Sequence, residues 1–121
     1  MKYQNDLRDR TKKFALRIIR LSSSLPSGRE VDVIGKQIIR SGTSVGAQFR
    51  EAYRAKSKAD YISKIKGSIQ ELDETQYWLE LLIESKIIEE KLLLPLIQEA
   101  EELLAIITTI IRKVKEKSAS E

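Results

Sequence analysis

The sequence predicts an all-α protein, an antiparallel up-down-up-down four-helix bundle. Apolar residues recur three or four positions apart through four long segments, which is the period of an amphipathic helix. Short runs that contain proline, glycine or serine separate these segments, and no segment competes with them as a strand. Long helices joined by short connections pack as antiparallel neighbours, so an up-and-down bundle is the expected arrangement.

The first helix is expected over residues 3–24. Its apolar stripe has one gap, which Thr11 fills, and its members are Tyr3, Leu7, Phe14, Ile18, Leu21 and Leu25. The run Pro26-Ser27-Gly28 separates it from a second helix over residues 30–55, because proline and glycine interrupt helices. Glu30 and Asp32 lie in the first turn of that second helix, where negative charge suits the helix dipole.

The second helix contains three interior glycines, Gly35, Gly42 and Gly46. Each interior glycine costs about 1 kcal/mol relative to alanine in a helix. Close approach of a neighbouring helix would compensate for this cost. The alternative is a helix that is locally weak or kinked.

The third helix is expected from Ser57 to about Glu84, since Ser57 and Asp60 resemble a capping box. Its predicted stripe is Ile62, Ile65, Ile69, Leu72, Gln76, Leu79 and Ile83, with Gln76 as a satisfied polar group that sets register or lies in an interface. A fourth helix is expected over residues 90–117, with Pro95 in or just after its first turn. Residues 1–117 therefore form a single domain, and residues 118–121 are expected to be a frayed tail.

The second half of the third helix is apolar on more than one side, because Tyr77, Trp78 and Leu81 fall off the main stripe. This pattern predicts an oligomer interface at these three residues. The alternative is a wide core-facing side in a monomer.

Cysteine and histidine are both absent from the sequence. Disulfides, thiolate metal sites and the commonest general base are thereby excluded. No phosphate-binding glycine loop or histidine–carboxylate di-metal pattern occurs, so we expect no enzyme, no catalytic residues, no metal and no cofactor. The charged N-terminal residues lack the features of a signal peptide, and no run is long enough to span a bilayer. A cytoplasmic protein with no membrane partner is expected.

Charge is distributed unevenly along the chain. Residues 1–66 hold 16 Lys or Arg against 6 Asp or Glu, net +10, whereas residues 67–121 hold 6 against 12, net −6, which gives +4 in total. This asymmetry indicates either a polyanion partner or charge pairing within a bundle or between subunits. An RNA or DNA partner would be bound through phosphates, without base readout. The predicted contacts are Arg40, Arg50, Arg54, Lys56 and Lys58, followed by Lys12, Lys13, Arg17 and Arg20.

The segment IIRSGTSVGA at residues 38–47 strongly resembles the bacterial four helix bundle protein family, whose members are encoded within 23S ribosomal RNA intervening sequences and are likened to ribosomal protein S23. The resemblance continues through residues 50–52, 55–61, 67–72 and 77–79. Gln48 stands where many members have asparagine, and Ala52 replaces the usual glycine.

The resemblance implies a four-helix bundle that assembles into a homopentameric ring or barrel. It also implies similarity to the accessory protein of diversity-generating retroelements, a basic pentamer that works with a reverse transcriptase and nucleic acid. Two functional hypotheses follow. The first is a non-enzymatic oligomer that binds RNA or DNA non-specifically, as a ribonucleoprotein accessory. The second is a structural or protein-interaction scaffold whose charges pair between subunits.

Overall fold

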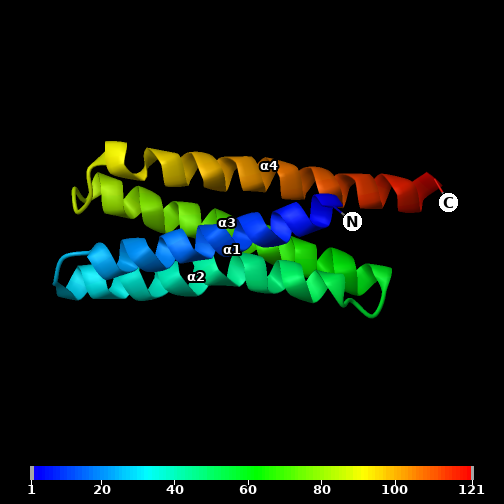
Figure 1. The fold of residues 1–121 in the computed structure, drawn as a ribbon, viewed down its shortest axis with the longest axis horizontal. Coiled ribbons are helices and arrows are strands. Elements are labelled where there is room, and N and C mark those ends of the chain that lie inside the picture. The colour runs from blue at the N-terminus through cyan, green and yellow to red at the C-terminus, as the bar shows by residue number, and fades with distance from the viewer. Residues whose placement is uncertain (1, 121) are drawn as a thin grey trace.

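A computed structural model describes residues 2–120 of the protein. It contains four α-helices, which are α1 (Lys2–Ser24), α2 (Arg29–Tyr53), α3 (Lys58–Glu84) and α4 (Glu90–Ser120). The helices alternate in direction along one long axis (Figure 1), and no strand occurs between residues 2 and 120. The predicted all-α four-helix bundle is confirmed.

The helices are not packed equally against one another. The contact between α2 and α3 is the most extensive, α1 packs on α2, α4 packs on α3, and α1 touches α4 only sparsely. The α2–α3 turn and both chain ends lie at the same end of the bundle (Figure 1). Helix α4 continues past the predicted end at Lys117, so residues 118–120, predicted to fray, lie in its last turn. This extension contains no proline or glycine that would stop the helix.

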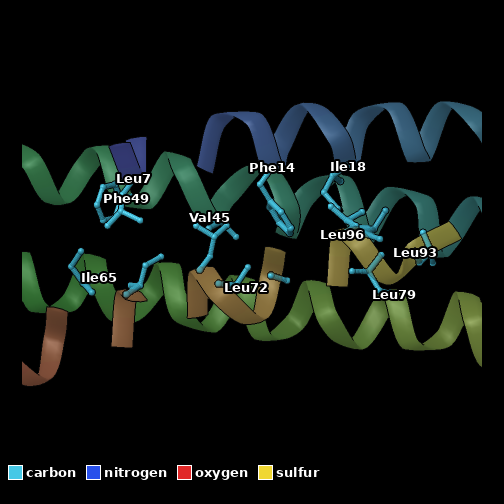
Figure 2. Close-up of a cluster of buried hydrophobic side chains, with 14 of the residues drawn as sticks. Leu7, Phe14, Ile18, Val45, Phe49, Ile65, Leu72, Leu79, Leu93 and Leu96 are labelled. Atoms are coloured by element: carbon cyan, nitrogen blue, oxygen red, sulfur yellow. The ribbon is translucent and has the colours of Figure 1, made fainter. Parts of the chain in front are cut away.

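The hydrophobic core runs along the bundle and receives side chains from all four helices. Figure 2 shows these side chains meeting between the helices, with Leu7, Phe14 and Ile18 from α1, Val45 and Phe49 from α2, Ile65, Leu72 and Leu79 from α3, and Leu93 and Leu96 from α4. Thr11 is completely buried in the α1 stripe, in the place predicted for it.

The buried stripe of α3 differs from the predicted one. Its buried residues are Ile65, Ser68, Leu72, Thr75, Leu79 and Leu82, whereas Ile69, Gln76 and Ile83 are only half-buried. Helix α3 packs against both α2 and α4, so it carries a second covered stripe beside the first. The Ser68 hydroxyl donates to the carbonyl oxygen of Val45 at 2.8 Å, which satisfies a polar group in the core.

Two of the three glycines in α2 allow close helix packing. A Cβ at Gly42 would lie 2.8 Å from Cγ1 of Ile18, and a Cβ at Gly46 would lie 3.1 Å from Oγ1 of Thr11. The predicted close contact between helices is therefore confirmed at these positions. At Gly35 the nearest atoms, in Leu25 and Ser22, would lie 3.5 Å away, which is ordinary contact distance, so the expectation was wrong there.

The predicted start of α3 is confirmed by its cap. The Ser57 hydroxyl accepts a hydrogen bond from the backbone N–H of Asp60 at 3.0 Å, and the Asp60 carboxylate accepts one from the backbone N–H of Lys56 at 3.1 Å. Pro95 lies inside α4, five residues after its start at Glu90, so the helix lacks the backbone hydrogen bond that an N–H at this position would donate. No helix within residues 2–120 combines the length and apolarity that a membrane crossing requires.

Candidate nucleic-acid interface

The α2–α3 turn and the chain termini lie at one end of the bundle (Figure 1), and the segments of the four helices at this end contain basic residues, so we call it the basic end. They are Arg8 of α1, Arg50 and Arg54 at the end of α2, Lys56 in the turn, Lys58, Lys64 and Lys66 at the start of α3, and Arg112, Lys113, Lys115 and Lys117 near the end of α4. The C-terminal half of the sequence is acidic overall, but the residues near its end are basic. Because α4 is antiparallel to α3, these residues lie beside the start of α3, which belongs to the basic half of the sequence.

A pocket of about 350 Å³ lies between α1 and α2 at the basic end, and we call it the arginine pocket. Arg8, Arg50, Glu51, Tyr53 and Arg54 line it. The guanidinium carbon of Arg8 lies 5.1 Å from the centroid of the Tyr53 ring, in cation–π contact.

The arginine pocket keeps an excess of positive charge. Its one carboxylate, Glu51, lies 3.3 Å from the Lys64 ammonium, so a cation on α3 already balances it. Arg8, Arg50 and Arg54 make no ion pair within the described part of the chain. The pocket is therefore suited electrostatically to an anion.

A second pocket of about 250 Å³ adjoins the first and shares Arg8 and Arg50 with it. It is also lined by Thr11, Lys12, Ala15, Thr43, Gly46 and Ala47. The small residues in this lining leave the surface shallow, and Lys12 adds another exposed cation. Because the two pockets share Arg8 and Arg50, we refer to them together as the α1–α2 groove.

The groove includes only some of the residues predicted to contact nucleic acid. Lys12, Arg50 and Arg54 line it, while Lys56 and Lys58 lie exposed just beyond it, in the α2–α3 turn and at the start of α3. Helix α2 ends at Tyr53. Arg50 and Lys58 are therefore separated by the turn between two helices.

Arg40 lies on a different face and is engaged within the bundle. Its guanidinium pairs with Glu71 of α3 at 3.3 Å and with Glu74 of the same helix. This arrangement matches the alternative expectation of charge pairing inside the bundle.

The remaining predicted cations lie on other sides of α1. Lys13 pairs with Asp9 one turn earlier at 3.0 Å. Arg17 and Arg20 border a separate pocket against the start of α4, whose lining is mainly apolar and includes Leu21, Ile88, Leu92, Leu93 and Leu96. These residues therefore lie apart from the groove.

Sequence reasoning missed two features of the basic end. Arg8 was not among the predicted contacts, although its spacing of four from Lys12 places both on one face of α1. Lys66 and Lys115 were assigned to different halves of the sequence, yet they are neighbours. The pKa of Lys115 is lowered because its neutral amine can accept a hydrogen bond from the Lys66 ammonium and because two ammonium groups repel each other.

The residues predicted as an oligomer interface form a hydrophobic patch on α3. Tyr77 is 52 % exposed, and its ring centroid lies 5.1 Å from that of Trp78. Trp78 and Leu81 are half-buried, and the buried indole N–H of Trp78 has no hydrogen-bond partner within the described residues. We refer to Tyr77, Trp78 and Leu81 as the α3 patch.

Groups of three or more acidic, histidine or cysteine side chains suited to a metal ion do not occur in the described part of the chain.

Comparison with known proteins gives two findings. The model of the 23S rRNA-intervening sequence protein family matches residues 4–109. The crystal structure of a protein of unknown function from the S23 ribosomal protein family, from Bacteroides thetaiotaomicron, is 39 % identical and has a TM-score of 0.85, covering 93 % of this chain and 99 % of that one. No curated protein matches the sequence.

Proposed function

The chain belongs to the 23S rRNA-intervening sequence protein family, and from this premise we propose that it is a non-enzymatic helical-bundle protein that binds RNA or DNA non-specifically. The observation that carries this proposal is the α1–α2 groove, which Arg8, Lys12, Arg50 and Arg54 line without an ion pair to any acidic side chain among the described residues. The family's link to ribosomal RNA makes a ribonucleoprotein accessory in the cytoplasm the corresponding role.

The proposed mode of binding is contact with phosphates. Each arginine or lysine that meets a phosphate releases condensed counterions, which gives affinity without sequence preference. The exposed lysines of the α2–α3 turn would extend this contact beyond the groove.

We also propose that the protein is a homo-oligomer, with a pentamer as the assembly that the resemblance implies. The α3 patch supports this, since Tyr77 exposes much of an aromatic ring beside Trp78, and aromatic residues are enriched at interfaces. The similarity to the retroelement accessory protein makes a reverse transcriptase a further proposed partner.

A second candidate function is a scaffold without a nucleic-acid role. It is favoured by the cations that already pair between helices. Arg10 of α1 lies 2.7 Å from Glu99 and 3.1 Å from Glu102 of α4, and the hydrogen bond with Glu99 is the main reason that the pKa of Arg10 is raised. Such pairing could also occur between subunits.

Fluorescence anisotropy with labelled single-stranded and duplex RNA and DNA, over a range of salt concentrations, separates the two candidates. Arg50→Gln with Arg54→Gln removes two groove cations, and Arg17→Gln with Arg20→Gln removes the same charge outside the groove. If the groove binds phosphates, the first pair lowers the slope of log affinity against log salt by about 2, and the second pair leaves it nearly unchanged. Equal effects of the two pairs would refute the groove as the interface. A lack of binding, together with an oligomer that dissociates at high salt, would support the scaffold.

A further inference from the structure

The arginine pocket brings three guanidinium groups from two helices into one small volume. Arg8 is held by the Tyr53 ring, and that ring packs edge-on against the buried Phe49 ring with centroids 6.2 Å apart. The backbone N–H of Arg54 donates to the carbonyl oxygen of Glu51 at 3.1 Å, which anchors Arg54 at the end of α2. The contact with the Tyr53 ring therefore holds the Arg8 guanidinium at the pocket, and a preorganised group binds with less loss of entropy.

Tyr53 adds a hydrogen-bonding group that lacks a partner. Its hydroxyl is buried and makes no hydrogen bond with any described residue, and the Tyr53 side chain is part of the lining of the arginine pocket. A buried polar group without a partner destabilises the folded protein. An oxygen-rich anion in the pocket would accept a hydrogen bond from this hydroxyl and charge-assisted bonds from the arginines.

The charge and the number of free oxygens favour a phosphate monoester over an internal phosphodiester as the anion bound in the pocket. A monoester carries about −1.5 to −2 charge at pH 7 and presents three free oxygens, whereas a diester within the chain carries one charge and presents two. Three arginines, with Glu51 already balanced by Lys64, match the monoester better.

The α1–α2 groove gives the rest of the nucleic-acid strand one path away from a phosphate in the arginine pocket. The second pocket of the α1–α2 groove shares Arg8 and Arg50 with the arginine pocket and leads past Lys12. Its lining also includes Ala15 and Ala47, whose side chains are small. A strand end fits this arrangement, because a terminal phosphate is attached on one side only.

We infer that the arginine pocket is a subsite for the terminal phosphate monoester of an RNA or DNA strand. Arg8, Arg50 and Arg54 contact its oxygens, the Tyr53 hydroxyl donates a hydrogen bond to it, and the next nucleotide lies along the groove towards Lys12. The inference rests on the proposed function and adds to it a preference for strand ends that carry phosphate.

The test compares three internally labelled oligonucleotides of one sequence, with a 5′-phosphate, a 3′-phosphate or hydroxyl groups at both ends. One phosphorylated form is expected to bind about fivefold or more tightly than the hydroxyl form, and which form does so identifies the end that is recognised. Tyr53→Phe keeps the ring that holds Arg8, and it is expected to remove most of this preference while binding of the hydroxyl form stays nearly constant. Lys56→Gln, a control in the adjacent turn, is expected to weaken all three equally.

The outcomes distinguish this inference from the proposed function. Equal binding of the three oligonucleotides overturns the phosphate subsite and leaves non-specific binding intact. If none binds, the proposed function fails, and a parallel NMR titration with inorganic phosphate and a nucleoside 5′-monophosphate tests the pocket alone. Saturable shifts at Arg8, Tyr53 and Arg54 that Tyr53→Phe weakens support the subsite, and their absence overturns it.

Discussion

The hydroxyl oxygens of Ser41 on α2 and Thr75 on α3 lie 2.9 Å apart in a hydrogen bond, and both side chains are completely buried. Thr75 is also hydrogen-bonded to the carbonyl oxygen of Glu71 at 2.8 Å. This polar pair lies in the most extensive helix contact of the bundle. It therefore fixes the position of α2 relative to α3 more specifically than apolar packing alone.

Removing one member of this pair is expected to destabilise the protein. Thr75→Val preserves the shape of the side chain but leaves the Ser41 hydroxyl with only the distant carbonyl of Ile38, at 3.5 Å. We expect the free energy of unfolding to fall by about 1–3 kcal/mol, measured by urea denaturation. In a double-mutant cycle with Ser41→Ala, the double variant should lose less than the sum of the single losses. Strict additivity would show that the two hydroxyls act independently.

Alanine is expected to have opposite effects at two glycines of α2. At Gly42 the new Cβ would lie 2.8 Å from Ile18, so Gly42→Ala should lower the free energy of unfolding by about 1–3 kcal/mol through overpacking. At Gly35 the nearest atoms would be 3.5 Å away, so Gly35→Ala should raise it by roughly 0.5–1 kcal/mol through helix propensity. Thermal denaturation followed by circular dichroism compares the two, and a stabilising Gly42→Ala would contradict the close packing at Ile18.

The helices and their order could be predicted because their signals are local. Apolar periodicity, the Ser57 cap and the Pro26–Gly28 break each act within a few residues, and the structure contains all of them. The buried stripe of α3 was harder to predict. Ser68 and Thr75 occupy core positions because α2 supplies partners for their hydroxyls, and a partner on another helix cannot be identified from spacing along one helix.

The candidate site could be predicted only in part for the same reason. Arg50 and Arg54 were found because they lie close together in sequence. The position of Arg8 depends on α1 packing beside α2, and the neighbourhood of Lys66 and Lys115 depends on the direction of α4. Arg40 has the same local pattern as Arg50, and only the tertiary fold places Glu71 and Glu74 beside it.

Arg40 is expected to contribute to stability slightly and to nucleic-acid affinity very little. Its side chain is 48 % exposed, so solvent screens its pairs with Glu71 and Glu74. Arg40→Gln should lower the free energy of unfolding by about 0–1 kcal/mol. In the anisotropy assay its affinity should match that of the unmodified protein, and a loss as large as that of Arg50→Gln would contradict this placement.

The pKa of Lys115 is expected to depend on the charge of Lys66, its neighbour at the basic end. Because Lys66 lowers the pKa of Lys115, protonating Lys115 is less favourable in the folded protein than in the unfolded chain. The resulting destabilisation is present below the folded-state pKa and is relieved as pH rises through it. Lys66→Ala should raise the pKa of Lys115 towards its ordinary value of 10.5, as measured by NMR titration of the lysine side chains. An unchanged pKa would show that the two ammonium groups do not interact in solution.

Disrupting the α3 patch is expected to dissociate the proposed oligomer without unfolding the subunit. Tyr77→Asp with Leu81→Asp introduces two charges where Tyr77 is exposed and Leu81 half-buried, so the core of the bundle is not altered. Light scattering on a sizing column should give a lower mass, because burying these carboxylates in an interface is costly. Trp78 is the only tryptophan, so its fluorescence should shift to longer wavelength as the patch becomes hydrated.

Leu92→Asp, at a residue that is 66 % exposed on α4, is the matched control and should leave the mass unchanged. A double variant with unchanged mass and helical content would exclude the α3 patch as the interface, and a mass change with Leu92→Asp alone would place the interface on α4.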